Sequence, residues 1–244
     1  MLKSFLIVLS FISVIPVPAP EWTPPNLRWF CVMIPIVGVI FGGLWAALRH
    51  ILSWSGLSPI LRGFVMMILT LALTGGLHLD GLMDSCDAIF SHRDRETRLR
   101  ILSDTHAGSF AVMACVIVLM AKTLLFSELF TLNADPLTLF PVPIFSRLGM
   151  SVLLVNLPFA KTGGLAVILG SSRNRRDNIF FVMMFVILSA VSMKIIPAMM
   201  IFCVILHVII CVKLFGGITG DLLGAFVEAS EVIMLSGMVI MFCI

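Results

Sequence analysis

Long apolar stretches separated by short polar segments run through the whole chain. A helix needs roughly 20 apolar residues to cross the hydrocarbon core of a membrane, and several stretches approach that length. Residues 4–15 are also apolar, but they end at Pro16 and are too short for a full span. We therefore predict a short N-terminal helix that lies in the interface or is half-inserted. The seven predicted spans cover about residues 29–49, 58–79, 108–130, 137–157, 178–194, 197–215 and 222–244.

Composition assigns the chain to one class of protein. Of its 244 residues, 60% are hydrophobic and 12% are charged, with a mean hydropathy of +1.14. A soluble domain of this length needs far more polar surface. Helices satisfy their own backbone hydrogen bonds in lipid, so we predict an all-α, polytopic membrane bundle forming one domain over residues 1–244. The net charge of +3 is small, and no nucleic-acid partner is expected.

Basic residues predict the orientation in the membrane. Residues 93–100 carry four arginines and residues 173–176 carry three. Two predicted spans separate these clusters, so they share a face, and two further spans bring residues 216–221 to that face. By the positive-inside rule it is the cytoplasmic face of the cytoplasmic (inner) membrane. Arg49 and Arg62 fall on the opposite face and count against this orientation.

The segment between residues 74 and 110 carries four aspartates that bear on chemistry. If residues 77–90 are helical, then Asp80, Asp84 and Asp87 lie within roughly 40° of one stripe. Three carboxylates on one stripe repel one another unless a positive charge lies between them, and magnesium prefers such oxygen ligands. Asp104 follows in a polar segment. The alternative is a solvated helix end just outside the membrane.

Two cationic residues fall inside predicted spans, Lys122 in the third and Arg147 near the middle of the fourth. A charge at such a depth costs about 2.5–3.5 kcal/mol, so both side chains should face protein. Two interpretations remain open for each residue. One is an ion pair with a buried acid, Glu128 being one choice for Arg147; the other is a contact with an anionic substrate group.

The last predicted span carries three acids, Asp221, Glu228 and Glu231. Glu228 points the same way as Asp221 and lies about 10 Å further along the helix. Glycines at 216–220 let a backbone approach a ligand closely, and a helix start attracts phosphate. His78, beside the first aspartate, is equally consistent with a ligand, an acid–base group or a buried hydrogen-bonded histidine.

Three long motifs, GGLHLDGLMDSCDAIF, ILSDTHAGSF and GGITGDLLGAFVEASE, resemble those of the cobalamin synthase family, which are adenosylcobinamide-GDP ribazoletransferases. The FLIVLSFISVIPVP start, the segment from Pro143 to Arg147 and the KTGGLA of residues 161–166 also look like family landmarks. The likeness extends in order over nearly the whole chain. His106 is a departure, because a more basic residue is expected there.

The resemblance implies a membrane transferase that joins α-ribazole, or its 5′-phosphate, to adenosylcobinamide-GDP with release of GMP. This step assembles the nucleotide loop of adenosylcobalamin or its 5′-phosphate. Magnesium is the expected cofactor, held by Asp80, Asp84, Asp87 and Asp221. The candidate catalytic residues are Asp80, Asp84, Asp87, Asp104, Asp221 and Glu228. The candidate substrate-binding residues are Gly75, Gly76, His78, Lys122, Arg147, Gly216, Gly217, Thr219, Gly220 and Glu231.

Two other functions are compatible with intramembrane acids. A CDP-alcohol phosphotransferase has an Asp-rich membrane helix, but Asp80-Gly81 here lacks the Ala-Arg pair of that family's signature. An ion-coupled transporter should show internal repeats and polar sites near the midplane, whereas most acids here fall at one surface. We rank both below the transferase. The sequence leaves the oligomeric state open, and a homo-oligomer is compatible with it.

Overall fold

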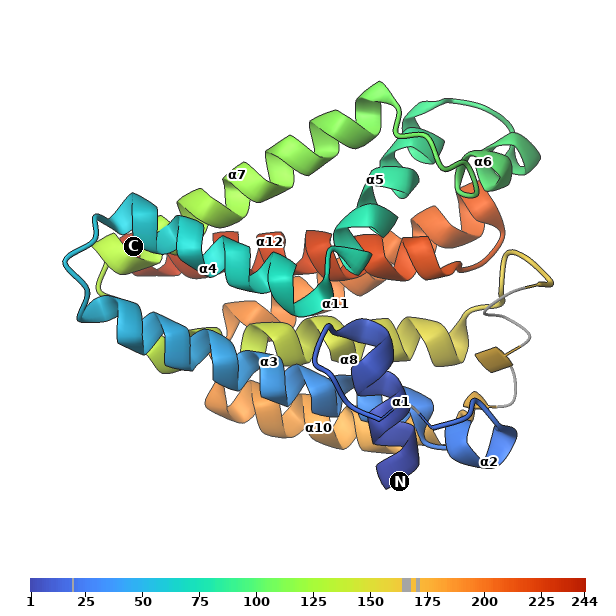
Figure 1. Cartoon of the computed structure of the whole chain (residues 1–244), viewed down its shortest axis with the longest axis horizontal. Helices are drawn as coiled ribbons and strands as arrows, with labels where there is room; N and C mark the ends of the chain where they lie inside the picture. Colours follow the sequence, from blue (N-terminus) through green and yellow to red (C-terminus); the bar gives the residue numbers. More distant parts are fainter. Residues whose placement is uncertain (19, 164–167, 170–171) are drawn as a thin grey trace.

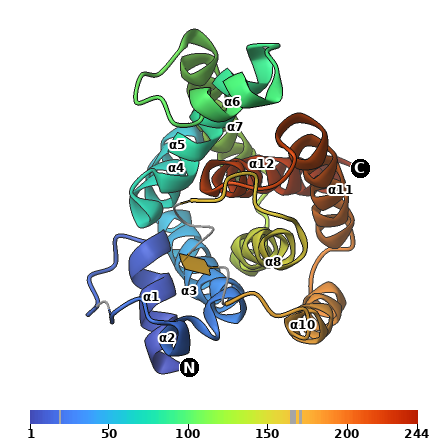
Figure 2. The ribbon, with the colours of Figure 1, turned by 90° about the vertical axis from the view of Figure 1, so that its right-hand side faces the viewer.

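The computed structural model describes residues 1–18, 20–163, 168–169 and 172–244, and within these ranges the regular structure is helical. Figure 1 shows the long helices lying side by side along the longest axis of the molecule. Figure 2 views the bundle from one end and shows α8 between α3, α10, α11 and α12. The prediction of an all-helical membrane bundle is confirmed.

Five helical segments are long and apolar enough to cross a membrane. A bent pair of helices, α4 and α5, gives six if it is counted as one broken span. The five segments are α3 (Phe30–Ser53), α7 (Ser109–Thr131), the 3-10 turn η1 with α8 (Pro136–Asn156), α11 with a π-helical turn (Ile195–Phe215), and α12 (Gly220–Cys243).

The fifth predicted span, residues 178–194, is shorter than expected. It corresponds to α10 (Asp177–Val191), whose 15 residues reach only about 22 Å at 1.5 Å per residue. The N-terminal segment forms α1 (Leu2–Ile12), which is likewise too short to span and packs on α3. A single-turn helix, α2 (Pro24–Leu27), connects this region to α3.

The second predicted span was expected to run to residue 79, and this boundary is wrong. Helix α4 (Pro59–Thr74) ends earlier, and α5 (Leu77–Phe90) leaves it at 90°. Gly75 and Gly76 make this turn with φ angles of +60° and +80°, a conformation that costs glycine little. The sequence predicts a helix over residues 77–90, and α5 confirms it. The bend directs α5 across α12 (Figure 1).

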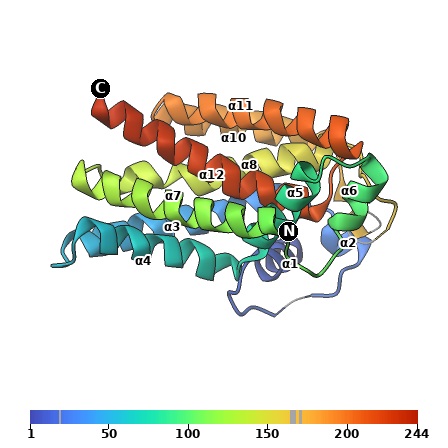
Figure 3. The same cartoon turned by 90° about the horizontal axis from the view of Figure 1, so that it is seen from above.

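The connections at one end of the bundle are tied to one another. Helix α6 (Arg95–Ile101) packs on the π-helical turn (Cys211–Phe215). The Ala160 N–H donates to the Ile218 carbonyl at 2.9 Å, and Arg173 donates to the Leu157 carbonyl. Both basic clusters and the glycine-rich loop therefore lie at the same end, as the sequence predicts. Figure 3 shows α6 at this end and the connection between α3 and α4 at the other.

Candidate active site

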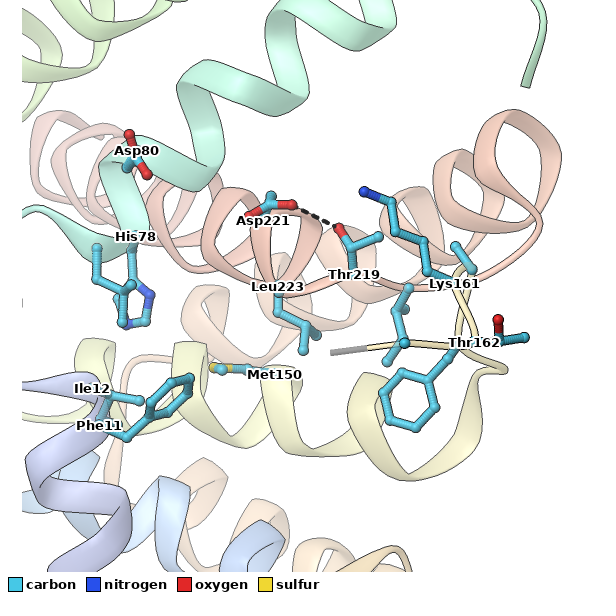
Figure 4. Close-up of a pocket in the computed structure, with 16 residues that line it drawn as sticks. Phe11, Ile12, His78, Asp80, Met150, Lys161, Thr162, Thr219, Asp221 and Leu223 are labelled. Carbon is cyan, nitrogen blue, oxygen red and sulfur yellow. Dashed lines mark hydrogen bonds between the residues drawn. The ribbon is translucent and has the colours of Figure 1, made fainter. Parts of the chain in front are cut away.

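A cavity of about 760 Å³ opens at the end where these connections meet. Its walls come from α1, α8, the starts of α5 and α12, and the segment that follows α8. Figure 4 shows its polar side chains, with the Lys161 side chain extending from the segment after α8 toward Thr219 and Asp221 at the start of α12. The polar side chains that line it are His78, Asp80, Lys161, Thr162, Thr219 and Asp221. Two of the predicted motifs therefore meet in one cavity although they are far apart in sequence.

Glycines bring the two acidic helices together. A Cβ on Gly81 would lie 2.7 Å from the Asp221 carbonyl oxygen, so α5 and α12 approach closely only without a side chain there. Similarly, a Cβ on Gly224 would lie 3.1 Å from the His78 backbone. Small residues allow this kind of contact between membrane helices. The sequence predicts that both Asp221 and Glu228 lie near the aspartate stripe. The packing brings Asp221 there, whereas Glu228 pairs with Lys122 and does not line the cavity.

The start of α12 is fixed by Thr219. Its hydroxyl accepts a hydrogen bond from the Leu222 N–H at 3.3 Å and donates to Asp221 at 3.3 Å, so it acts as the N-cap. Gly216 before it has a φ of +71°, and a Cβ on Gly217 would collide with the Pro158 carbonyl. The glycine-rich loop thus packs tightly on the segment after α8.

The aspartates of α5 do not have equal surroundings. Asp80 is exposed and lines the cavity, whereas Asp84 is half-buried. The negative charges of four other aspartates act electrostatically on Asp84, namely those of Asp80, Asp221, Asp87 and Asp104. This crowding of negative charge is the feature that predicts a bound cation. Within the described ranges, however, no three His, Cys, Asp or Glu residues converge closely enough to form a ready metal site.

The Asp87 carboxylate already accepts hydrogen bonds from the backbone. The donors are the Gly108 N–H at 2.6 Å and the Ala111 N–H at 2.9 Å, at the first turn of α7. These bonds satisfy N–H groups that lack a partner within the helix. Asp87 therefore connects α5 to α7, a role that the sequence analysis did not anticipate.

Asp104 lies in the exposed connection between α6 and α7. It accepts a hydrogen bond from the backbone N–H of His106 at 3.0 Å and pairs with the His106 ring at 2.8 Å. These bonds, from the ring and then from the backbone, hold the pKa of the Asp104 carboxyl below its usual range. His106, the departure from the family pattern, thus contacts a candidate catalytic residue directly.

The charged residues inside the bundle form a separate network, and it does not line the cavity. Lys122 lies 2.7 Å from both Glu228 and Glu231, and Arg147 pairs with Glu231. Arg147 also donates to Ser146 at 2.9 Å. All four charged side chains are buried. This geometry favours the ion-pair interpretation for Lys122 and Arg147, with Glu231 in place of Glu128 as the arginine's partner.

His78 lies between the cavity and this network. Only 2% of its surface is exposed, and its Nε2 has no hydrogen-bond partner among the described residues. The charges of Arg147, Glu231 and Lys122 act on it. A buried ring nitrogen without a partner is costly unless a ligand completes its hydrogen bonds. A substrate atom in the cavity would supply that partner.

Two cations at this end of the bundle were not among the site residues predicted from the sequence. Lys161 lines the cavity, bonds to Ser103 of the α6–α7 connection and acts electrostatically on Asp221. The guanidinium of Arg95 lies over Gly216, where any Cβ would collide with it. Lys161 begins the KTGGLA motif, so the family resemblance could have identified it as a candidate site residue. Residues 164–166 of this motif lie outside the described ranges.

The fold and this site are those of a polytopic helical membrane protein with a cavity that carries carboxylates at one end of the bundle. The sequence model of the cobalamin-5-phosphate synthase family matches residues 4–239. The chain therefore belongs to this family of cobalamin-biosynthetic transferases. This membership argues against the CDP-alcohol phosphotransferase and transporter alternatives.

Curated relatives align over nearly their full length. An adenosylcobinamide-GDP ribazoletransferase of Geobacillus sp. (strain WCH70) is 34% identical over 241 residues, covering 94% of this chain and 92% of the relative. That of Halalkalibacterium halodurans is 33% identical over 242 residues, with coverage of 94% and 92%. That of Clostridium botulinum (strain Alaska E43 / Type E3) is 29% identical over 238 residues, with coverage of 95% and 94%. No solved structure matches the chain significantly.

Proposed function

We propose that this enzyme joins α-ribazole, or its 5′-phosphate, to adenosylcobinamide-GDP and releases GMP. The relatives, which align over nearly their full length, are named for this activity. The observation that supports the proposal best is the cavity in which Asp80, Asp221 and Lys161 lie together. It combines carboxylates with a cation at the point where the two glycine–acid motifs meet.

The reaction transfers the cobinamide phosphoryl group from GMP to the acceptor hydroxyl. The acceptor hydroxyl attacks the phosphorus on the cobinamide side of the pyrophosphate, a new P–O bond forms, and the bond to the GMP oxygen breaks. The proton of the hydroxyl passes to a carboxylate, and Asp80 and Asp221 are the acids that line the cavity. Lys161 is placed to neutralise charge on the leaving phosphate, and His78 to orient a substrate oxygen.

Magnesium fits the donor set, because several carboxylates crowd around Asp84 and hard cations prefer oxygen ligands. Asp80, Asp84 and Asp221 would hold the ion, with Asp87 contributing an oxygen while it caps α7. A bound divalent cation supplies neutralisation of charge on the transferring phosphoryl group. Glu228 and Asp104 remain weaker candidates, since one pairs with Lys122 and the other with His106.

We further propose that the cavity faces the cytoplasm of a bacterial cell. Both basic clusters lie at its end of the bundle, and such clusters are retained on the cytoplasmic side. The proposed substrates are polar and water-soluble, so a cavity open to the cytoplasm would meet them directly. The prediction for labelling is that cysteines introduced at Arg98 and Arg175, in a variant without the native cysteines, react from the cytoplasmic side.

The test uses purified protein in lipid nanodiscs with adenosylcobinamide-GDP, α-ribazole or its 5′-phosphate, and magnesium. We expect GMP to form in equal amount with the corrinoid product, and only when both substrates are present. Asp80→Asn should remove most of this activity, because it neutralises a cavity carboxylate. Asp135→Asn is the matched control at the other end of the bundle, where Asp135 caps η1. Absence of GMP from folded wild-type protein under all these conditions would refute the proposal.

A further inference from the structure

A second polar cavity, of about 360 Å³, lies at the end of the bundle opposite the candidate active site. It forms where the connection between α3 and α4 meets the connection between α7 and η1. Arg49, His50, Arg62 and Asp135 contribute its charged or titratable side chains, around the ring of Phe130. These arginines are the ones whose positions count against the predicted orientation, so their environment needs an explanation.

Two guanidinium groups lie against the same aromatic ring. The Arg49 carbon Cζ lies 4.1 Å from the centre of the Phe130 ring, and the Arg62 Cζ lies 5.6 Å from it. Arg49 is 2% exposed and donates to the carbonyls of Leu129 and Ala134 at 2.8 and 2.5 Å. The two cations are thus held close together by the fold, which is unfavourable without a neutralising group.

The described part of the chain supplies that neutralisation only in part, because Asp135 acts electrostatically on Arg49 but forms an ion pair with neither arginine. Neither arginine forms an ion pair with a carboxylate there, whereas Lys122 and Arg147 both do. Asp135 lines the cavity, but its Oδ1 accepts a hydrogen bond from the Leu137 N–H at 2.7 Å. The Nε of Arg49 and that of Arg62 are buried without any hydrogen-bond partner. Arg49 is buried and Arg62 is half-buried, and close cations with unused donors point to an anionic ligand.

The position of the cavity indicates the source of the anion. Trp54 lines it and is 82% exposed, and Ile51 beside it is 64% exposed. Exposed tryptophan and aliphatic side chains at the end of a spanning helix are typical of the membrane–water interface. Lipid phosphates lie at this depth, and a planar guanidinium matches their oxygens. Leu57 and Leu61, also exposed, extend the apolar surface next to the cavity.

We propose that this cavity binds the phosphate group of an anionic phospholipid in the leaflet opposite the candidate active site. The guanidinium of Arg62, which lines the cavity, contacts the phosphate, and Arg49 supplies a second positive charge. The acyl chains lie along the exposed apolar side chains of α3 and α4. The lipid thereby neutralises two cations that the positive-inside rule disfavours on this face.

The test compares lipid retention by the full-length protein in native mass spectrometry. Wild-type protein, delipidated in detergent, is offered phosphatidylglycerol, phosphatidylcholine or inorganic phosphate. We expect retention of phosphatidylglycerol, and a higher melting temperature with it than with phosphatidylcholine. Arg62→Gln should weaken this binding about fivefold, the effect expected for one cation next to an anionic headgroup. Arg62→Lys, which keeps the charge, should bind better than Arg62→Gln.

Lys194→Gln is the matched control, because Lys194 is an exposed cation in the α10–α11 connection at the same end of the bundle. It should bind phosphatidylglycerol like the wild type. Release of GMP by each variant establishes that the protein is folded. The proposal is overturned by equal retention of both lipids, by full displacement of the lipid with millimolar phosphate, or by wild-type binding in folded Arg62→Gln.

Discussion

The buried network makes a quantitative prediction for Glu231→Gln. Glu231 is 1% exposed and neutralises Arg147 and, at 2.7 Å, Lys122. Glutamine keeps the shape but removes the charge, so the two cations are left with Glu228 alone. Breaking a buried pair in this way costs about 3–5 kcal/mol. For a chain of this size, the melting temperature should fall on the order of 10 °C.

Thermal unfolding in one detergent, followed by tryptophan fluorescence, measures this effect. Glu96→Gln removes the same charge from the exposed surface of α6 and should leave the melting temperature unchanged. Combining Glu231→Gln with Arg147→Met should recover part of the loss, because the uncompensated cation is removed as well. If Glu231→Gln unfolds like the wild type but needs more substrate for half-maximal GMP release, Glu231 binds substrate and our ion-pair interpretation is wrong.

The remaining predictions concern the cavity. Gly81→Ala should abolish GMP release because its Cβ would separate α5 from α12, whereas Gly43→Ala should be silent because nothing lies within 4 Å of that position. Asp84→Asn should lose most activity and its response to magnesium in titrations, with an unchanged melting temperature; wild-type turnover at every magnesium concentration would contradict a metal role. Lys161→Met should lower kcat for GMP release more than Lys213→Met, which removes an exposed cation from the same end. Equal rates for the two lysine variants would exclude a phosphate contact by Lys161.

The sequence by itself determined that this is a helical membrane protein, and it predicted most of the helices, including the aspartate-rich α5. Hydropathy is a local property, so a run of apolar residues predicts a helix without knowledge of its neighbours. The 3.6-residue period likewise places Asp80 and Asp84 on one face of α5 before any packing is known. The family motifs, which are contiguous in sequence, carried the prediction of function.

The tertiary structure decided which charged groups meet. Arg147 and Glu231 are 84 residues apart, and their pairing depends on how α8 packs against α12. The tertiary structure likewise places Lys161 at the cavity, and the packing of α5 against α7 lets Asp87 accept hydrogen bonds at the first turn of α7. Two glycines at the end of α4 marked a turn in the sequence, but its 90° direction depends on the close contact of α5 with α12. A charge in a low-dielectric interior must find a partner, yet the choice among several acids is made only when the helices pack.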